Sequence, residues 1–404
     1  MARPELSHGV TRSARPRRML PGLVVTCFAL FVSVPGAFAA EPIKIGALLP
    51  YSGVFAALGV EIADALDLGF DTFGREVGGR EIVVIREDTE GKPNVGLSKA
   101  KKLVLRDGVE FLVGPVSSAV AGALRDYVHA SQVPLIIANA GNNHLTGESC
   151  SPYVIRVSFS NAQINRDMGS WMVSKGFKRV FLMAADYAAG RQMMEAFRTS
   201  FVAAGGTVAG EEYAPLSTKD FGPYLGKLKA ARPEAAYVFF PGAAAMAFVP
   251  QYEGFGLKET IQLAGAGWLS SAFNIERQGA AAAGFIGALN YVPSIDSPEN
   301  IAFQEAFRAR FGRVGSEFAV QGYDSARLIV EALKLTGGST EGITEAMHQV
   351  SFVGPRGELR IDPLTNNVIQ DIYVFETRSV GERIEQVVID RFADVRDPPN
   401  GCRL

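Results

Sequence analysis

The sequence lacks the motifs by which most enzymes and nucleotide-binding proteins are recognised. It has no glycine-rich loop ending in Gly-Lys-Ser/Thr, no Gly-x-Ser-x-Gly elbow and no His-Glu-x-x-His pair. It has only 4 histidines among 404 residues, and their spacing fits no metal site. The "GAG" of residues 265–267 lacks the third glycine of a dinucleotide fingerprint. We therefore expect a protein that is not an enzyme and that uses neither a metal nor a cofactor.

Cysteine is also scarce, and one of the three cysteines lies in an export signal. Cys27 sits within the apolar run Leu20–Val34, which follows a basic segment and precedes the small-residue pattern Ala37-Phe38-Ala39. This run is shorter than the ~20 apolar residues that a membrane-spanning helix needs. We predict a signal peptide over residues 1–39, cleavage near Ala40, and a mature protein in the periplasm.

The two remaining cysteines, Cys150 and Cys402, then meet an oxidising compartment. We predict that they form a disulfide that ties the C-terminal tail to the body of the protein. The alternative is a pair of free thiols. The bond closes a loop of about 250 residues, which corresponds to a nominal ~5 kcal/mol in the chain-entropy model.

Positive charge is in deficit once the signal peptide is removed. The chain holds 40 Lys+Arg and 42 Asp+Glu, of which five Arg and one Glu lie in residues 1–40, so 35 remain against 41, a net charge of −6. A mildly acidic protein is a poor partner for nucleic acid or anionic lipid. The length of 404 residues exceeds what one hydrophobic core usually organises and predicts two domains. We expect a monomer.

What the sequence does have is a regular alternation of strand and helix patterns. Strands such as Ile43–Leu49 and Arg179–Ala185 are near-continuous apolar runs, which is typical of parallel strands buried on both faces. Two such series lie before and after a polar stretch at residues 139–163. The pattern predicts an α/β fold with two doubly wound parallel sheets. Long helices near 300–311 and 318–335 and a closing strand pair follow.

The most informative stretch is "VEFLVGPVSS", in which a strand ends and a helix begins at Ser117 and Ser118. Free backbone N–H groups at a helix start attract carboxylates, although an ordinary helix cap without a ligand remains the alternative. The next strand ends in Asn139, Ala140 and Gly141, small or polar residues that let a ligand approach the backbone. Because the carboxyl ends of parallel strands meet at one edge, the two segments predict a single site for a small anion.

Together with "IKIGALLPYSGVFAALG", "VPLIIANAGN", "ADYAAG" and "AVQGYDSARLIVEAL", this stretch resembles the Leu/Ile/Val-binding family of periplasmic solute-binding proteins of ABC transporters. The resemblance covers essentially the whole mature chain. It implies the type I periplasmic-binding-protein fold, in which two lobes joined by three crossing strands close on a small ligand and deliver it to a membrane permease. The predicted lobes are 41–157 plus 294–362, and 158–293 plus 363–404.

The resemblance also implies roles for individual residues. Ser118, with Ser117 beside it, matches the position that holds the ligand carboxylate, and Asn139 to Gly141 match the backbone contacts on the neighbouring strand. Tyr187 matches the aromatic residue of the opposing lobe. The first loop would add Ser52, Phe55 and Leu58 to the lining.

Two departures from the family pattern concern the ligand. Where amino-acid binders carry an acidic residue for the ligand ammonium, this chain has Gly267 beside Trp268, and Ala243 stands where a bulky aromatic is common. A buried ammonium without its carboxylate costs several kcal/mol. We therefore expect an aromatic or hydrophobic acid. The candidate ring walls, for each of which core packing is the alternative, are Phe55, Tyr187, Phe240, Trp268 and Tyr291.

Other functions remain open at this point. A branched-chain amino acid or amide could be bound in the same transport role, and the same pocket could serve a ligand sensor for a signalling receptor. A hydrolase using Ser117 or Ser118 lacks an evident paired base. A regulator of amide-responsive operons conflicts with the export signal.

Overall fold

The computed structural model describes residues 11–15 and 40–404. The predicted signal peptide falls almost wholly outside these ranges, and residues 11–15 are exposed and without regular structure. Residues 39–404 form one compact unit, to which the following description applies. Within the described residues, every helix is too short or too polar to cross a membrane.

The first sheet has six strands in the order β2-β3-β1-β4-β5-β6, and every pair except β2–β3 is parallel. Its strands are β1 (Ile43–Leu49), β2 (Glu76–Val77), β3 (Arg80–Asp88), β4 (Phe111–Val113), β5 (Leu135–Ile137) and β6 (Val154–Arg156). The helices between them are α1 (Ala56–Phe73), α2 (Pro93–Lys102) and α3 (Ser118–Ser131). The apolar side chains of β1, β4 and β5 are almost entirely buried, as expected for strands covered on both faces.

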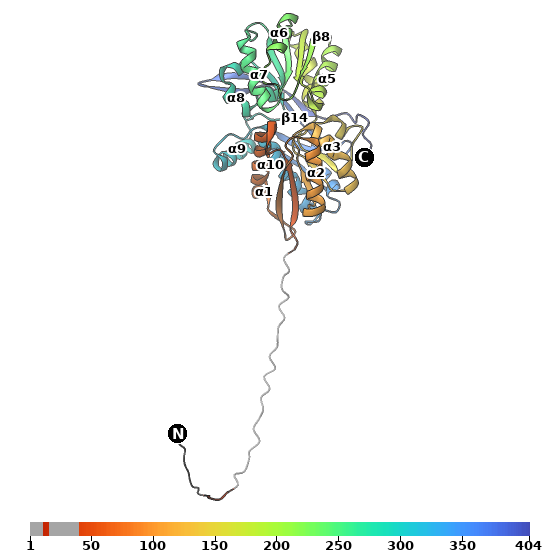
Figure 1. The fold of residues 1–404 in the computed structure, drawn as a ribbon, viewed down its shortest axis with the longest axis vertical. Helices are drawn as coiled ribbons and strands as arrows, with labels where there is room; N and C mark the ends of the chain where they lie inside the picture. The colour runs from red at the N-terminus through yellow and green to blue at the C-terminus, as the bar shows by residue number, and fades with distance from the viewer. Residues whose placement is uncertain (1–10, 16–39) are drawn as a thin grey trace, which may run out of the picture. The chain divides into compact units, whose positions relative to one another are not determined.

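The second sheet begins after the first chain crossing, at residues 157–160. Its parallel part has the order β11-β10-β9-β7-β8. The strands are β7 (Arg179–Ala185), β8 (Thr207–Ala214), β9 (Ala235–Phe239), β10 (Gln262–Ala266) and β11 (Ile286–Leu289). The helices are α4 (Asn161–Ser174), α5 (Ala188–Ala203), α6 (Gly222–Ala231), α7 (Gly242–Gly254) and α8 (Ala272–Gln278). Figure 1 shows this part in yellow-green to teal, apart from the orange elements of the first sheet.

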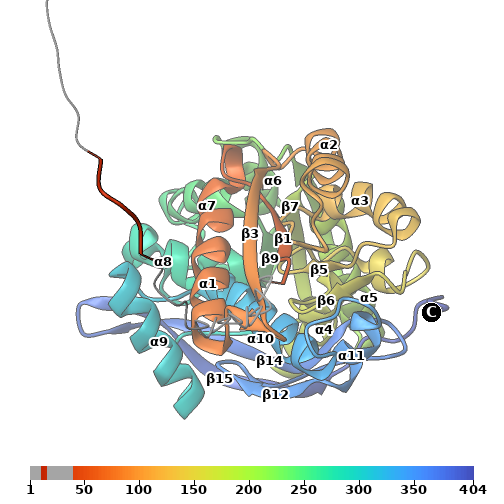
Figure 2. The same cartoon turned by 90° about the horizontal axis from the view of Figure 1, so that it is seen from below.

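The C-terminal third of the chain joins both parts through a second crossing, at residues 290–297, and a third crossing, at residues 362–370. After β11 the chain returns to the first sheet through α9 (Pro298–Phe311), α10 (Glu317–Leu335) and α11 (Ile343–Gln349), and α10 lies along α1 (Figure 2). The hairpin β12 (Ser351–Gly354) and β13 (Gly357–Ile361) leads to β14 (Val368–Val380), which pairs antiparallel with β11 and with β15 (Arg383–Val395). We call the first sheet with α1–α3 and α10 lobe one, and β7–β11 with α4–α8 lobe two.

The predicted fold class is confirmed, with two parallel sheets and a closing antiparallel strand pair. The β12–β13 hairpin, which the sequence reading left without a strand assignment, pairs with the start of β14 through Arg360 and Ile361. Helix α2 ends as an α-helix at Lys102 and continues as a π-helical turn over Leu103–Asp107. The lobe boundaries remain a prediction.

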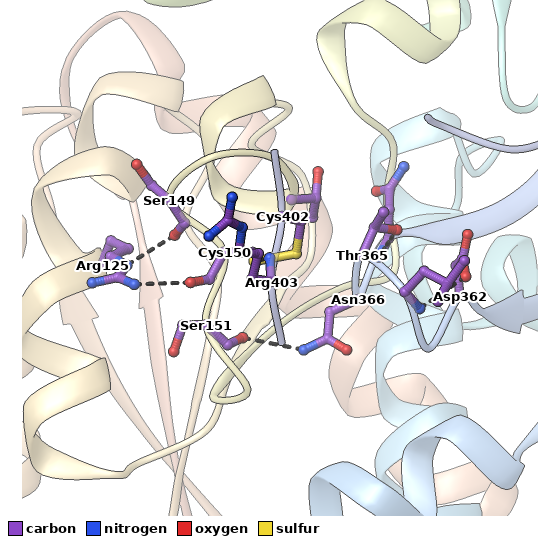
Figure 3. The surroundings of a disulfide bond; sticks show 12 residues. Arg125, Ser149, Cys150, Ser151, Asp362, Thr365, Asn366, Cys402 and Arg403 are labelled. Atoms are coloured by element: carbon purple, nitrogen blue, oxygen red, sulfur yellow. Dashed lines mark hydrogen bonds between the residues drawn. A yellow bond between two sulfur atoms is a disulfide. The ribbon is translucent and has the colours of Figure 1, made fainter. Parts of the chain in front are cut away.

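The predicted disulfide between Cys150 and Cys402 is confirmed, with a Cα–Cα distance of 5.4 Å (Figure 3). Its surroundings hold the loop in place. The Arg125 guanidinium of α3 donates to the carbonyl oxygens of Ser149 and Cys150, at 2.8 Å each. The amide of Asn366 donates to the Ser151 carbonyl at 3.1 Å. The bond therefore anchors the C-terminal tail to a segment that other contacts have already fixed.

Candidate functional site

A pocket lies where the carboxyl ends of the strands of the two lobes face each other. Its cavity volume is only about 30 Å³, room for one or two water molecules. The two lobes are thus closed tightly around it. Its lining residues are Phe55, Leu58, Val116, Ser118, Asn139, Gly141, Phe159, Asn161, Tyr187, Ala189, Met193, Phe239, Pro241, Gly242, Trp268 and Phe318.

Lobe one contributes the start of α3. Ser117 is the N-cap and Ser118 the first helical residue, and both are buried. The first backbone N–H groups of a helix have no partner within the helix, so they point out of α3 as donors for an anion. The Ser118 hydroxyl accepts a 3.3 Å hydrogen bond from the Asn161 amide of lobe two. This end of the pocket therefore carries polar groups from both lobes.

The end of β5 supplies the neighbouring wall. Asn139 lines the pocket, and its amide donates to Gln321 of α10 at 2.6 Å. At Gly141 a Cβ atom would lie 2.4 Å from Asn161 Oδ1 and 2.6 Å from the Phe159 ring. Only glycine fits there, and its lack of a side chain keeps Phe159 and Asn161 against the pocket.

Most of the remaining wall is aromatic. The Phe159 and Trp268 ring centroids are 4.4 Å apart, and Phe239 lies edge-on to Trp268 at 6.2 Å. Tyr187 of lobe two lies between Phe239, at 6.2 Å, and Phe55 of lobe one, at 6.5 Å. Burial raises the pKa of the Tyr187 hydroxyl, which keeps it a neutral donor at physiological pH. The six rings of the lining are Phe55, Phe159, Tyr187, Phe239, Trp268 and Phe318.

Seven of the fourteen residues expected from the sequence line this pocket. They lie at the start of α1 and in the loop before it, at the start of α3, just after β5, just before α5 and in the turn after β10. These residues are Phe55, Leu58, Ser118, Asn139, Gly141, Tyr187 and Trp268.

Two of the aromatic residues expected in the pocket wall lie outside the pocket. Phe240 is fully buried against Phe221 and Phe248, at 4.7 and 5.1 Å. Its neighbour Phe239 lines the pocket instead, because successive side chains of a strand point to opposite faces. Tyr291 is buried in a separate cluster, where its hydroxyl donates to Asn300 Oδ1 at 2.7 Å.

Five smaller residues of the expected set also lie outside the lining. Ser52 and Ala243 are exposed, and Gly242 takes the place expected for Ala243. A Cβ atom on Gly267 would meet Leu289 and Phe375, so this residue faces the core of lobe two. Ser117 occupies the N-cap position of α3 without a side-chain capping hydrogen bond, and Ala140 donates its backbone N–H to the Pro115 carbonyl.

The structure adds lining residues that the sequence reading missed. Phe159 lies in the first crossing and Asn161 directly follows it, Met193 lies on α5, and Phe318 is the second residue of α10. The polar stretch "SFSNAQ" around residue 160 was the available signal, because a lone phenylalanine among small polar residues fits neither a core strand nor an exposed loop. Phe318 gave no such signal, since its helix belongs to the other end of the chain.

The lining carries no lysine, arginine, aspartate or glutamate among the described residues. A ligand ammonium would therefore be buried here without a counter-charge. A carboxylate, by contrast, has the N–H groups of α3 and the hydroxyls of Ser118 and Tyr187 as donors. The electrostatics of this pocket suit an anion better than a zwitterion.

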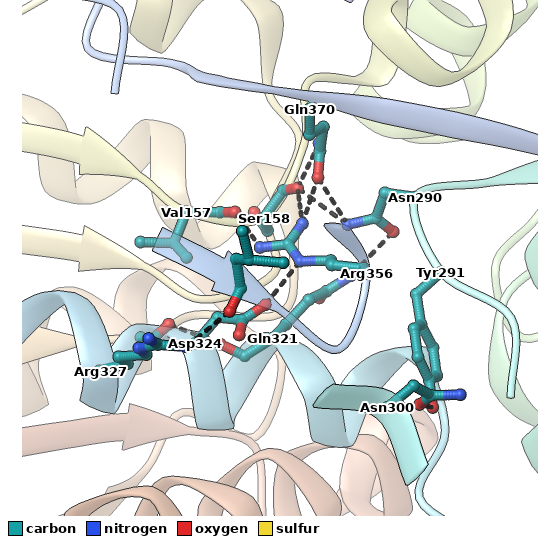
Figure 4. A network of polar contacts seen from close by, with 12 residues as sticks. Val157, Ser158, Asn290, Tyr291, Asn300, Gln321, Asp324, Arg327, Arg356 and Gln370 are labelled. Atoms are coloured by element: carbon teal, nitrogen blue, oxygen red, sulfur yellow. Dashed lines mark hydrogen bonds and ion pairs between the residues drawn. The ribbon is translucent and has the colours of Figure 1, made fainter. Parts of the chain in front are cut away.

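A buried polar network connects the pocket to the crossing segments (Figure 4). The Arg356 guanidinium donates to Asp324 Oδ2 at 2.6 Å, to the Val157 carbonyl at 2.6 Å and to the Ser158 carbonyl at 3.1 Å. Its side chain and that of Asp324 are fully buried. Gln370 of β14 accepts a further hydrogen bond from Arg356 and donates to the Ser158 carbonyl at 2.7 Å. The first and third crossings are thus tied to α10 by one side chain.

The second crossing and the pocket enter the same network. Asn290 donates to the Ser158 carbonyl at 3.0 Å and accepts from the Gln321 amide at 3.4 Å. Gln321 in turn accepts from Asn139 of the pocket wall. Hydrogen bonds therefore run without a break from the pocket to all three crossings.

Two lobes that meet at a closed pocket through three crossings define a ligand-binding protein of the hinged-clamp class. The chain belongs to the periplasmic binding protein family, whose model matches residues 42–382. It is 31% identical over 361 residues to Leu/Ile/Val-binding protein homolog 6 of Brucella melitensis, which covers 88% of this chain and 92% of the relative. The protein is thus a solute-binding protein of an ABC transporter.

Solved structures of similar proteins include aromatic-acid complexes. A solute-binding protein of an ABC transporter from R. palustris, in complex with benzoate, has a TM-score of 0.85 and 33% identity, covering 90% of this chain and 100% of that one. Another from Rhodopseudomonas palustris BisB5, in complex with 3,4-dihydroxybenzoic acid, has a TM-score of 0.85 and 32% identity, with coverage of 89% and 99%. Both are solute-binding proteins of ABC transporters.

Proposed function

We propose that this protein captures a small aromatic carboxylate in the periplasm and delivers it to the membrane permease of an ABC importer. The observation that carries the proposal is the lining itself, which has six aromatic rings, a helix N-terminus and no charged side chain among the described residues. A ring stacked on aromatic neighbours gains ~0.5–1.5 kcal/mol per pair beyond burial. The carboxylate is held by charge-assisted hydrogen bonds at the start of α3.

The aromatic lining favours a one-ring acid. Because the cavity of this closed form is only about 30 Å³, the lobes must separate to admit any ligand, and the ligand-bound form must be somewhat more open than this one. In that form a single aryl ring with its carboxylate lies between Phe55, Tyr187 and Trp268. Peptides and sugars are too large and too polar for this lining.

The mechanism is conformational and involves no chemical step. The ligand binds between open lobes, contacts to both lobes stabilise the closed form, and the permease recognises that form. We propose a monomeric protein without a nucleic-acid partner and without catalytic activity. The benzoate and dihydroxybenzoate complexes of the relatives support the ligand class.

Calorimetric titration of the purified protein with benzoate, 4-hydroxybenzoate and leucine tests the proposal. We expect the two aryl acids to bind and leucine to give no signal. Trp268→Leu should weaken aryl-acid binding at least tenfold, whereas Phe240→Leu, outside the lining, should leave it within about twofold. Tight binding of leucine with no response to aryl acids would overturn the proposal, and would fit the name of the Brucella relative.

A further inference from the structure

One buried carboxyl group belongs to the residue that precedes a pocket-lining phenylalanine. Glu317, the first residue of α10, is 0% exposed. Neither of its carboxyl oxygens has a hydrogen-bond partner of regular geometry within the described residues. Its neighbour Phe318 is part of the pocket lining. An ionised carboxylate in such a place is strongly disfavoured.

The group that Glu317 faces belongs to the other lobe. The hydroxyl of Ser271, at the start of α8, lies against the carboxyl group and is itself buried without another partner. Phe318 follows Glu317 directly, and its ring meets that of Phe273, two residues after Ser271, edge-on at 6.3 Å. Glu317 and Ser271 are therefore buried by the same contact that brings α8 of lobe two onto α10 of lobe one.

Among residues 11–15 and 40–404, no cation lies close enough to Glu317 to affect the pKa of its carboxyl. Its burial raises the pKa of the carboxyl to about 8, and Glu61 of α1 raises it further, while its own backbone N–H and Ser271 act in the opposite direction. Tyr291 also interacts electrostatically with Glu317. Burial raises the pKa of its hydroxyl, which therefore stays neutral. On α8, Glu276 and Arg277 are exposed to solvent.

We propose that Glu317 and Ser271 form a proton-dependent latch between the lobes. When the lobes separate, the carboxyl group is exposed and ionises as an ordinary glutamate. When they close, the carboxylate takes up one proton from solvent and the resulting O–H donates to the Ser271 hydroxyl. Closure on the ligand is thus coupled to the binding of one proton.

The sign of the pH dependence follows from the two pKa values. In the open form the carboxyl has the ordinary value near 4.5, and in the closed form about 8. Closure therefore takes up a proton between these two values, and ligand affinity falls as the pH rises through this window. The limiting slope for one proton is tenfold in affinity per pH unit.

Glu61 provides a matched control. Its carboxyl is buried, and burial raises its pKa to about 7, although it accepts hydrogen bonds from Ser316 N at 3.2 Å and Ser316 Oγ at 2.8 Å. All of these groups lie on α1 and at the start of α10, within lobe one. Lobe opening leaves this carboxyl buried, so its proton does not move with the ligand.

The test is proton uptake on ligand binding, measured by calorimetry at pH 6.5 in two buffers of different ionisation enthalpy. The probes are benzoate, 4-hydroxybenzoate and leucine, and this choice rests on the proposed function. We expect the wild type to take up close to one proton per ligand bound. Glu317→Gln should take up none and show an affinity independent of pH between 5 and 8, whereas Glu61→Gln should retain the uptake.

Three outcomes decide between the ideas. Equal proton uptake in the wild type and Glu317→Gln, or no uptake in the wild type, refutes the latch whatever the ligand proves to be. Binding of leucine alone, with uptake lost in Glu317→Gln, refutes the ligand class and supports the latch. If no probe binds, the ligand class fails, and small-angle scattering of the ligand-free protein decides the latch. If the latch is correct, the wild type is more compact at pH 5 than at pH 8.5, whereas Glu317→Gln is equally compact at both.

Discussion

The ion pair between Arg356 and Asp324 offers a direct test of what holds the crossing segments together. We consider the substitution Arg356→Met, which keeps much of the side-chain volume but removes every donor. Both partners are 0% exposed and their Nε–Oδ2 distance is 2.6 Å. The substitution leaves the Asp324 carboxylate buried without its partner, and also the Val157 carbonyl that Arg356 donates to at 2.6 Å.

The magnitude follows from this loss of partners. Breaking a buried pair by removing one member costs about 3–5 kcal/mol, because an uncompensated charge stays behind. A buried carbonyl without a donor adds about 1–3 kcal/mol. Some of this is relieved by protonation of Asp324, since burial already raises its pKa. We therefore expect the free energy of unfolding to fall by about 3–5 kcal/mol.

Urea denaturation followed by circular dichroism measures this loss. The double variant Asp324→Leu with Arg356→Met removes the charge along with its partner, and should recover part of the loss because apolar replacement of a whole pair is often nearly neutral. A loss below about 1 kcal/mol for Arg356→Met alone, or no recovery in the double variant, would show that the pair does not hold the crossings as we describe.

Three further predictions concern the disulfide, the pocket residue Gly141, and Tyr291, which lies outside the pocket. Cys402→Ser should lower the thermal midpoint measured by calorimetry, since the bond closes a loop with a sequence separation of 252; the chain-entropy limit is ~5 kcal/mol, and an unchanged midpoint would contradict it. Gly141→Val should abolish ligand binding in a titration, because the added Cβ meets Asn161 and Phe159, and retained affinity would count against the pocket. Tyr291→Phe should cost about 1–3 kcal/mol in urea denaturation by leaving Asn300 without its donor, with ligand affinity unchanged.

The fold was predictable because its local signals agree. Strands such as β7 and helices such as α6 begin and end at the residues that the apolar runs and turn residues indicate. The β12–β13 hairpin was not predictable, because its strands are short and β13 pairs with the start of β14, which lies in the third crossing. Such pairing depends on the meeting of the two lobes and leaves little trace in local periodicity.

Part of the pocket could be predicted from the sequence, and the wall from lobe one was easier to predict than the wall from lobe two. In lobe one, Ser118 and Asn139 directly follow parallel strands, so topology alone brings them to one edge. In lobe two the segments were identified but the register was off by one, with Phe240 chosen in place of Phe239. A single step along a strand moves a side chain to the other face, and composition does not reveal which of two adjacent phenylalanines faces inward.

Native mass spectrometry of the protein purified from rich medium, with identification of any retained small molecule, tests the central claim most directly. We expect a monocarboxylic acid with one aromatic ring, bound one per chain and lost in Gly141→Val. A retained amino acid that survives in Gly141→Val would contradict both the ligand class and the pocket.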